Sequence, residues 1–163
     1  MKVLVVSDSH GNSGIVRMLL ETYKHKVQTV VHLGDNAKDL MQFDTDYPSL
    51  NFLAVAGNCD FFGGLPNERI LTIGDATPRQ VLLLHGHKLN VKSSYDRLMY
   101  YAREREVDAC LFGHSHMPFV YVHESVFFMN PGSVGEPRGG SKAGYGILTI
   151  DDEGNIAGEV LEI

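Results

Sequence analysis

The sequence is poor in cysteine and has no long apolar stretch, and both absences narrow the classes of protein that it can encode. Cys59 and Cys110 are its only cysteines, which excludes a disulfide-stabilised secreted scaffold. We therefore expect free thiols and a reducing, cytoplasmic setting. The first apolar run ends at Asp8, too early for a signal peptide. No segment reaches the roughly 18 apolar residues of a membrane-spanning helix, so we expect a soluble protein without a membrane partner.

Positive charge is also scarce. The formal net charge is −6, from 14 Lys and Arg against 20 Asp and Glu. Binding to the backbone of nucleic acids requires clustered Lys and Arg, so we expect no bulk nucleic-acid binding. Aspartates that hold divalent cations are neutralised by them, and a small charged substrate therefore stays compatible with this composition.

Length and hydrophobic pattern predict one globular domain over residues 1–163, in which 44% of the residues are hydrophobic. Apolar runs rich in β-branched residues predict strands at 2–7, 29–33, 51–56, 69–73, 80–84, 107–112, 119–123, 126–129, 145–150 and 156–163. Helical spacing predicts a helix up to Lys24 capped by Asn12 or Ser13, a short helix over 38–43, and a helix over 95–102 capped by Ser93 or Ser94.

The order of these elements predicts an α/β fold. Strands and helices alternate up to residue 65, as in parallel sheets, whereas the chain after it is richer in strands and hairpin-like connections. We expect two packed sheets with helices outside and with loops gathered at one edge, where α/β sheets bind ligands.

Ligand-type side chains stand at or near the ends of the apolar runs. They are Asp8, His10, Asp35, Asn58, His85, His114 and His116. Such a mixture of oxygen and imidazole donors suits manganese, iron, zinc, nickel or cobalt and does not suit thiolate-bound clusters. Two cations about 3.5 to 4 Å apart need a bridging carboxylate, and Asp35 is the natural bridge.

The blocks Asp8-Ser9-His10, Gly34-Asp35, Gly57-Asn58, His85 and Gly113-His114-Ser115-His116 occur in this order. In this the chain resembles the calcineurin-like metallophosphoesterases, and Asn130-Pro-Gly-Ser133 resembles the closing motif of their small bacterial and archaeal phosphodiesterase branch. The resemblance implies an αββα four-layer sandwich of two mixed β-sheets flanked by helices.

The resemblance also implies a dinuclear site. Asp8, His10, Asp35 and His116 would hold one divalent metal ion, and Asp35, Asn58, His85 and His114 the other. We expect manganese first, with nickel, zinc, iron and cobalt as alternatives. A metal-bridging hydroxide would then attack phosphorus in line, and Asp35, Asn58, His85 and His114 are the residues we expect to take part in catalysis.

One block departs from the family pattern. Many members carry His after Gly-Asn, where this chain has Cys59-Asp60, so protonation of the leaving group would fall to His87, Asp60 or bulk water. A diester with a good leaving group needs less help, and we therefore favour a phosphodiesterase acting on a small diester. The alternatives are a phosphomonoesterase or protein phosphatase, and a non-catalytic scaffold like the retromer subunit that shares this fold.

The remaining candidates receive structural interpretations. We assign no role to His25, His32 or His123, and we expect Cys59 to be an ordinary small side chain and Cys110 to lie in the core. His87 either orients a ligating imidazole or is a loop residue. Phe61 and Phe62 line a substrate pocket or contact a partner subunit, with packing expected for at least one of them, and an aromatic surface near Phe61 and Phe119 would suit a homo-oligomer. Residues 130–133 either shape a turn near the metals or form a plain β-turn.

Overall fold

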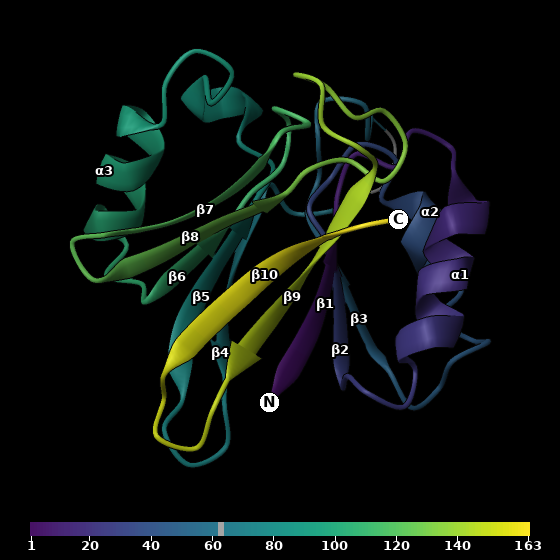
Figure 1. Cartoon of the computed structure of the whole chain (residues 1–163), viewed down its shortest axis with the longest axis horizontal. Helices are drawn as coiled ribbons and strands as arrows, with labels where there is room; N and C mark the ends of the chain where they lie inside the picture. The colour runs from purple at the N-terminus through teal and green to yellow at the C-terminus, as the bar shows by residue number, and fades with distance from the viewer. Residues whose placement is uncertain (62–63) are drawn as a thin grey trace.

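The computed structural model describes residues 1–61 and 64–163. Its elements are β1 (Lys2–Val6), α1 (Ser13–Tyr23), β2 (Thr29–His32), α2 (Lys38–Met41), β3 (Asn51–Ala54), β4 (Glu68–Ile73), β5 (Arg79–Leu84), the 3₁₀ turn η1 (His87–Leu89), α3 (Asp96–Glu104), β6 (Ala109–Leu111), β7 (Pro118–His123), β8 (Val126–Pro131), β9 (Gly144–Ile150) and β10 (Ile156–Glu162). Figure 1 shows their arrangement.

The strands form two five-stranded sheets, ordered β10-β9-β1-β2-β3 and β4-β5-β6-β8-β7. In the first sheet β1 pairs in parallel with β2 and antiparallel with β9. In the second, β5, β6 and β8 run parallel, and β4 and β7 add antiparallel edges. Both sheets are therefore mixed, as predicted.

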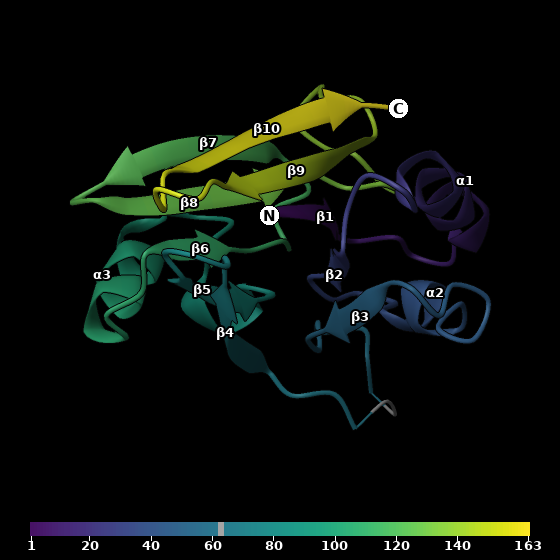
Figure 2. The ribbon, with the colours of Figure 1, turned by 90° about the horizontal axis from the view of Figure 1, so that it is seen from below.

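Three apolar clusters fill the spaces between four layers. One lies between the two sheets, a second between the first sheet and α1 with α2, and a third between the second sheet and α3. Figure 2 shows α1 and α2 on one outer side and α3 on the other. The predicted αββα sandwich is thus confirmed.

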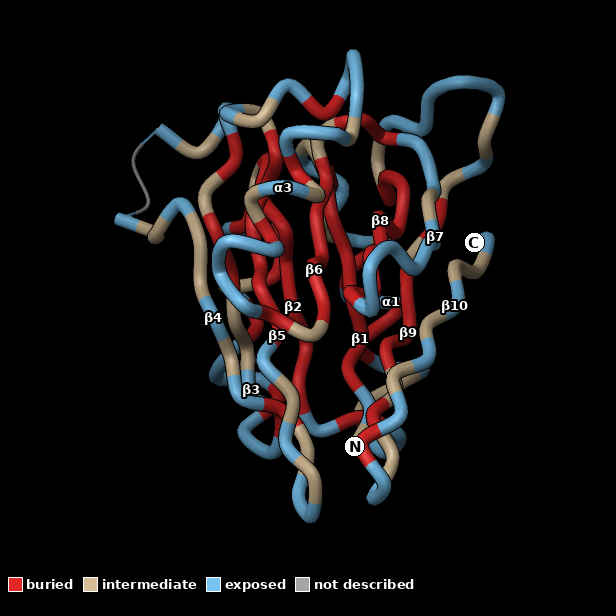
Figure 3. The backbone as a smooth tube through the Cα atoms, turned by 90° about the vertical axis from the view of Figure 1, so that its left-hand side faces the viewer, coloured by how far each residue is buried: buried red, intermediate tan, exposed pale blue. Residues whose placement is uncertain are grey.

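Strand β1 illustrates why the sequence folds in this way. Val3 and Val5 face the opposite sheet, whereas Leu4 and Val6 face the helices. A strand covered on both faces must be apolar at successive positions, and burying each such side chain contributes about 1.5 to 3 kcal/mol. Figure 3 shows the central strands buried along their lengths.

The predicted elements all occur, but several bounds and one cap differ. The strand predicted over 107–112 contains only Ala109–Leu111. The α1 N-cap residue Asn12 makes no side-chain capping hydrogen bond, whereas Ser94 Oγ accepts a hydrogen bond from the Asp96 amide at the start of α3. The turn η1 was not predicted. Within the described residues, no helix is long and apolar enough to cross a membrane.

Candidate metal centre

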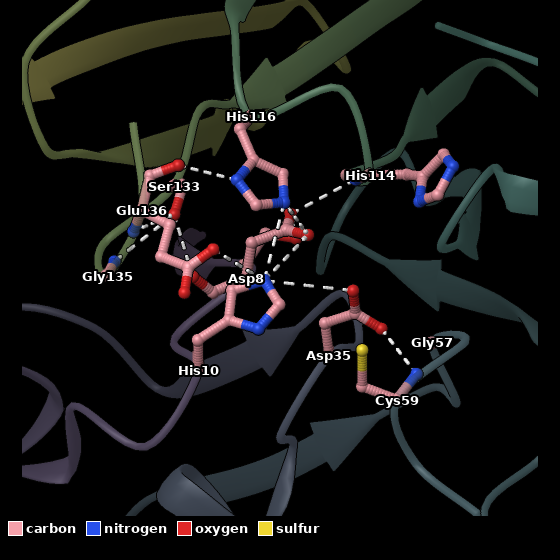
Figure 4. Close-up of polar contacts among 12 residues, drawn as sticks. Asp8, His10, Asp35, Gly57, Cys59, His114, His116, Ser133, Gly135 and Glu136 are labelled. Carbon is pink, nitrogen blue, oxygen red and sulfur yellow. Dashed lines mark hydrogen bonds and ion pairs between the residues drawn. The ribbon is translucent and has the colours of Figure 1, made fainter. Parts of the chain in front are cut away.

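The predicted ligands come together because their strands end at one edge of the sandwich. Asp8 and His10 follow β1, Asp35 follows β2, His85 follows β5, and the 114–116 segment follows β6. Figure 4 shows the side chains of Asp8, His10 and His116 pointing toward one another, with Asp35 beside them. Residues more than 100 positions apart in the sequence thus share one cluster.

The donor atoms form two groups that share one carboxylate. The first group contains Asp8, His10, Asp35 and His116, and the second contains Asp35, His85 and His114; within each group the donor atoms lie within 4.8 Å of one another. These are the sets that the resemblance implies, apart from Asn58. The shared Asp35 offers one oxygen to each side, since Oδ2 lies 3.8 Å from His10 Nε2 and Oδ1 lies 3.4 Å from His85 Nε2.

Two of the imidazoles are oriented by main-chain carbonyl groups. His85 Nδ1 donates to the Leu33 carbonyl oxygen at 2.7 Å, and His116 Nδ1 donates to that of Glu136. Because a carbonyl oxygen can only accept, Nδ1 carries the proton in both rings. Each ring then presents Nε2 toward the carboxylates, and this nitrogen is the one available to a metal ion.

The surroundings of Asp8 also fit a bound cation. Its Oδ2 accepts hydrogen bonds from Ser7 Oγ at 2.6 Å and from the His114 amide at 3.0 Å. Its Oδ1 is buried without a hydrogen-bond partner among the described residues and lies 3.1 Å from His116 Nε2. Burying a carboxylate oxygen without a hydrogen-bond partner costs free energy, and a divalent cation bound between Oδ1 and His116 Nε2 would offset that cost. The residues therefore fit a metal.

The electrostatics of the cluster favour the same conclusion. Burial opposes ionisation of Asp8 and Asp35, but the neighbouring histidines, with further hydrogen bonds, hold the pKa of both carboxyl groups below its usual value. Burial alone would lower the pKa of His85, yet the hydrogen bond with Asp35 and the two carboxylates raise it. Burial and the adjacent His85 lower the pKa of His114 to about 4. The cluster thus attracts positive charge and keeps His114 neutral.

The backbone at these positions is strained. Asp8, His10, Asp35, His114 and His116 have positive φ angles from 46° to 67°, a region that costs residues with a side chain about 1 to 3 kcal/mol each. Such strain persists where the surrounding fold enforces it, and it concentrates at functional sites. Five of the ten non-glycine residues with positive φ among the described residues are thus predicted ligands, and Asn36, beside Asp35, is a sixth at the site.

Glycines permit the close approach of the loops. Gly34 has a φ of +98°, and a Cβ added there would lie 2.6 Å from the Gly57 nitrogen and 2.9 Å from His85 Nδ1. A Cβ on Gly57 would lie 2.2 Å from Asp35 Oδ1. The glycines of the Gly-Asp and Gly-Asn blocks are therefore required by the packing of one loop against the other.

Asn58 stands on the loop after β3, which contacts the cluster through Asp35. The side chain is exposed, and its Nδ2 donates to Cys59 Sγ. The next amide, that of Cys59, donates to Asp35 Oδ1 at 2.8 Å. The loop that carries Asn58 therefore contacts the ligand Asp35, and metal binding by Asn58 remains a prediction.

Asp60 has a role that the sequence did not reveal. Its carboxylate accepts hydrogen bonds from the amides of Asp35 (2.8 Å), Gly57 (2.9 Å) and Ala37 (3.0 Å). Asp60 thereby joins the loop after β2 to the loop after β3. Both carboxylate oxygens of Asp60 thus accept hydrogen bonds from backbone amides, which argues against Asp60 as the donor of a proton to a leaving group.

A buried network behind the cluster was also missed. The Gly34 amide donates to His32 Nδ1 at 3.1 Å, so His32 Nε2 carries the proton and donates to Ser9 Oγ at 2.9 Å. Ser9 Oγ in turn donates to Asp39 Oδ2, which also accepts from the Gly11 amide, each at 2.7 Å. His32, predicted to pack only, therefore helps to hold the strained loop between Asp8 and Gly11.

The segment 130–133 is more than a plain turn. Asn130 Nδ2 donates to the Gly113 carbonyl oxygen at 2.9 Å and to Ser115 Oγ at 3.0 Å. Ser133 Oγ donates to the Asp8 carbonyl oxygen at 2.7 Å. The motif therefore clamps the loops that carry His114 and Asp8, and its position near the candidate ligands was predicted correctly.

The other candidates fall outside the cluster. His25 and His123 are exposed, and Cys110 is buried in the core as expected. Burial and Asp35 raise the pKa of the Cys59 thiol to about 11, which agrees with an ordinary side chain. His87 Nδ1 is buried without a hydrogen-bond partner among the described residues, so an orienting role for it gains no support.

The aromatic candidates differ from one another. Phe61 is 80% exposed, and Phe62 lies outside the described residues. Phe119 is half-buried, with its ring centroid 4.4 Å from that of Tyr95. Beside it on β7, Tyr121 is 50% exposed, with its ring centroid 6.0 Å from that of Phe119. The structure thus shows an exposed aromatic side chain near Phe119, and a homo-oligomer remains a prediction.

Comparison with known proteins agrees with the geometry. The sequence model described as the calcineurin-like phosphoesterase superfamily domain matches residues 1–153. The chain is 34% identical over 154 residues to the probable metallophosphoesterase YsnB of Bacillus subtilis, covering 94% of this chain and 86% of YsnB. It is 28% identical over 173 aligned residues to the phosphodiesterase YfcE of Escherichia coli, covering 93% and 89%.

Solved structures share the architecture. A predicted phosphoesterase from Streptococcus pneumoniae superposes with a TM-score of 0.75 at 34% identity, covering 93% of this chain and 83% of that one. Vps29 of Entamoeba histolytica, solved with Zn²⁺, superposes with a TM-score of 0.76 at 23% identity, covering 99% and 98%. The likeness to Vps29 is one of fold.

Proposed function

Because the chain belongs to the calcineurin-like phosphoesterase superfamily, we propose that it is a metal-dependent phosphodiesterase with a dinuclear centre. The observation that carries the proposal is the pair of donor groups that share Asp35. The ligands of one cation would be Asp8, His10, Asp35 and His116, and those of the other Asp35, Asn58, His85 and His114. Manganese is the first candidate, and nickel, zinc, iron and cobalt are the alternatives.

The chain's own residues fix the geometry of such a centre. The hydrogen bonds from Ser7 and from the His114 amide leave only Asp8 Oδ1 free to bind a cation, and the Leu33 carbonyl group holds His85 in the orientation that presents Nε2. Cations bound at these donors supply positive charge that offsets the charge of a phosphate and makes a water molecule more acidic. Ligands whose orientation is set in advance need no reorganisation during the reaction.

The surroundings of Asn58 favour a diester over a monoester as substrate. Cys59 replaces the histidine of many family members, and a thiol with a pKa of about 11 donates a proton far less readily than an imidazole. Asp60 is held by three amides. This loop therefore offers little help to a poor leaving group, and the name of the relative YfcE, a phosphodiesterase, is consistent with the proposal.

A non-catalytic scaffold is the rival from another class. We favour the enzyme because the donor groups of this chain meet within 4.8 Å of one another. The cytoplasm is the setting that we propose, since it suits the free thiols of Cys59 and Cys110.

The test is hydrolysis of bis(p-nitrophenyl) phosphate by chelator-treated protein supplied with Mn²⁺, Ni²⁺, Zn²⁺ or Mg²⁺. We expect turnover only after metal is added. Asp35→Asn should remove most of it, because both cations lose their shared ligand, while the matched surface variant His25→Ala should keep it. Equal activity in the two variants would refute the assignment of Asp35 as a shared metal ligand. No turnover with any of the metals would favour the non-catalytic scaffold.

A parallel assay with p-nitrophenyl phosphate separates the diesterase from the monoesterase. The two substrates release the same chromophore, so their kcat/KM values can be compared directly. A higher kcat/KM for the diester supports the proposal. A higher value for the monoester would make the protein a phosphatase.

A further inference from the structure

A cavity lies next to the candidate metal centre. Its volume is about 440 Å³, and it is lined by Asn36, Lys38, Met41, Cys59, Asp60, Phe61 and Leu65. This size falls within the range of small-molecule sites, which are concave and mostly apolar with a few polar groups. The cavity is therefore large enough for an organic group of a substrate.

Hydrogen bonds connect the wall of this cavity to the centre. The Cys59 amide donates to Asp35 Oδ1, and the Asp35 amide donates to Asp60 Oδ2, both at 2.8 Å. Figure 4 shows Cys59 directly beside the Asp35 carboxylate. A phosphate bound to cations held by Asp35 would thus have one of its ester groups within reach of the cavity.

The lining selects for a particular chemistry. Phe61 is 80% exposed although it lies among the apolar side chains of Met41 and Leu65 at the cavity. An exposed aromatic ring at the rim of a cavity is suited to stacking on another flat ring, a contact that is tolerant of the identity of that ring.

Lys38 adds a positive charge to the same cavity. It is exposed, and among the described residues its ammonium group makes no ion pair. The negative charge nearby belongs to Asp60, whose carboxylate is occupied by three amides. Lys38 is therefore free to attract an anionic group of a ligand.

We propose, on the basis of the function proposed above, that the cavity binds the ester group that the substrate keeps after hydrolysis, and that this group is a nucleotide. Its base stacks on Phe61, and a further phosphate of the nucleotide faces Lys38. The substrate class is then a small nucleotide-containing phosphodiester.

The test uses substrates with one leaving group and different retained groups. They are the p-nitrophenyl esters of methyl phosphate, of thymidine 5′-phosphate, and of thymidine 3′,5′-bisphosphate at its 5′-phosphate. Because p-nitrophenolate leaves in each case, the ratio of their kcat/KM values reports binding of the retained group. Wild-type protein should prefer the thymidine ester over the methyl ester.

Variants assign this preference to the cavity. Phe61→Ala should lower the ratio of kcat/KM for the thymidine ester to that for the methyl ester by about 5- to 20-fold, as expected for the loss of one stacking contact. Phe61→Tyr should retain the preference, and Tyr100→Ala, which removes a ring that is 65% exposed on α3, should not affect it. Lys38→Met should lower kcat/KM for the bisphosphate relative to the thymidine ester about 3-fold or more, in line with a partly exposed charge pair.

The outcomes separate this inference from the proposed function. If the methyl ester is hydrolysed but Phe61→Ala affects all substrates equally, or none of them, the cavity does not bind the retained group and the inference is overturned. If wild-type protein hydrolyses none of the esters with any metal, the proposed function fails, and this inference fails with it. Substrate preference that survives Phe61→Ala but not Lys38→Met would refute the stacked base.

Discussion

Removal of the Asp60 carboxylate should destabilise the protein even when no metal is bound. Asp60 accepts hydrogen bonds from the amides of Asp35, Gly57 and Ala37. In Asp60→Ala these amides lose their acceptor. Each hydrogen bond to a charged group contributes about 1.5 to 3 kcal/mol when buried, and because Asp60 is half-buried we take about 1 kcal/mol for each. The expected loss is therefore about 3 kcal/mol.

Asp60→Asn tests the geometry more closely. Its amide oxygen can replace Oδ2, which accepts from Asp35 and Gly57, but its NH₂ group would then face the Ala37 amide, and two donors would oppose each other. The loss should be about 1 to 2 kcal/mol. Asp44→Ala, at an exposed position after α2, is the matched control and should leave stability within about 0.5 kcal/mol of wild type.

The assay is urea-induced unfolding in the presence of a chelator, followed by circular dichroism. The predicted order of stability is wild type and Asp44→Ala, then Asp60→Asn, then Asp60→Ala. A loss below 1 kcal/mol in Asp60→Ala, or equal losses in both Asp60 variants, would show that the carboxylate does not join the loops as the hydrogen bonds indicate.

Other predictions concern the network, the glycines and the metals. Burial lowers the pKa of His32 from 6.5 to about 4. A histidine with a depressed folded-state pKa stabilises the fold above pH 6.5 and loses this contribution as the pH falls toward 4. The free energy of unfolding of His32→Gln should therefore fall less than that of wild type between pH 6.5 and pH 4, by up to about 3 kcal/mol. Gly34→Ala should cost about 3 kcal/mol or more in urea unfolding, whereas Gly140→Ala, which also has a positive φ but open space around it, should cost about 1 kcal/mol; equal costs would contradict the crowding. His85→Ala should halve the bound metal measured by elemental analysis, and retention of the full amount would remove His85 from the ligands.

The sequence predicts the strands of the two sheets well because buried strands appear in it as runs of apolar residues. Val3 to Val6 face two different apolar layers, so the run is apolar throughout and is recognised as a buried strand. The ligands stand directly after such runs, so their meeting at one edge follows from the direction of the strands.

What the sequence hides are contacts between loops. Asp60 holds amides that precede it by more than 20 residues, and Asp39 bonds to the loop after β1. Neither contact has a periodicity or a spacing that marks it. The half-buried state of Phe119 depends likewise on Tyr95, which precedes α3, and no local pattern marks that contact.

The position of β1 in the first sheet has a consequence for biosynthesis. Its neighbour on one side is β2, which follows shortly, but on the other side it pairs with β9, and Leu4 lies opposite Ile147. The Asp8 loop is likewise completed by Ser133 and by the Val134 and Gly135 amides, which donate to the carbonyl oxygens of Ser7 and Asp8. During synthesis on the ribosome, the backbone groups on one edge of β1 therefore stay unpaired until these distant segments emerge. Because His114 and His116 also come from the second half of the chain, both donor groups are complete only after these residues emerge.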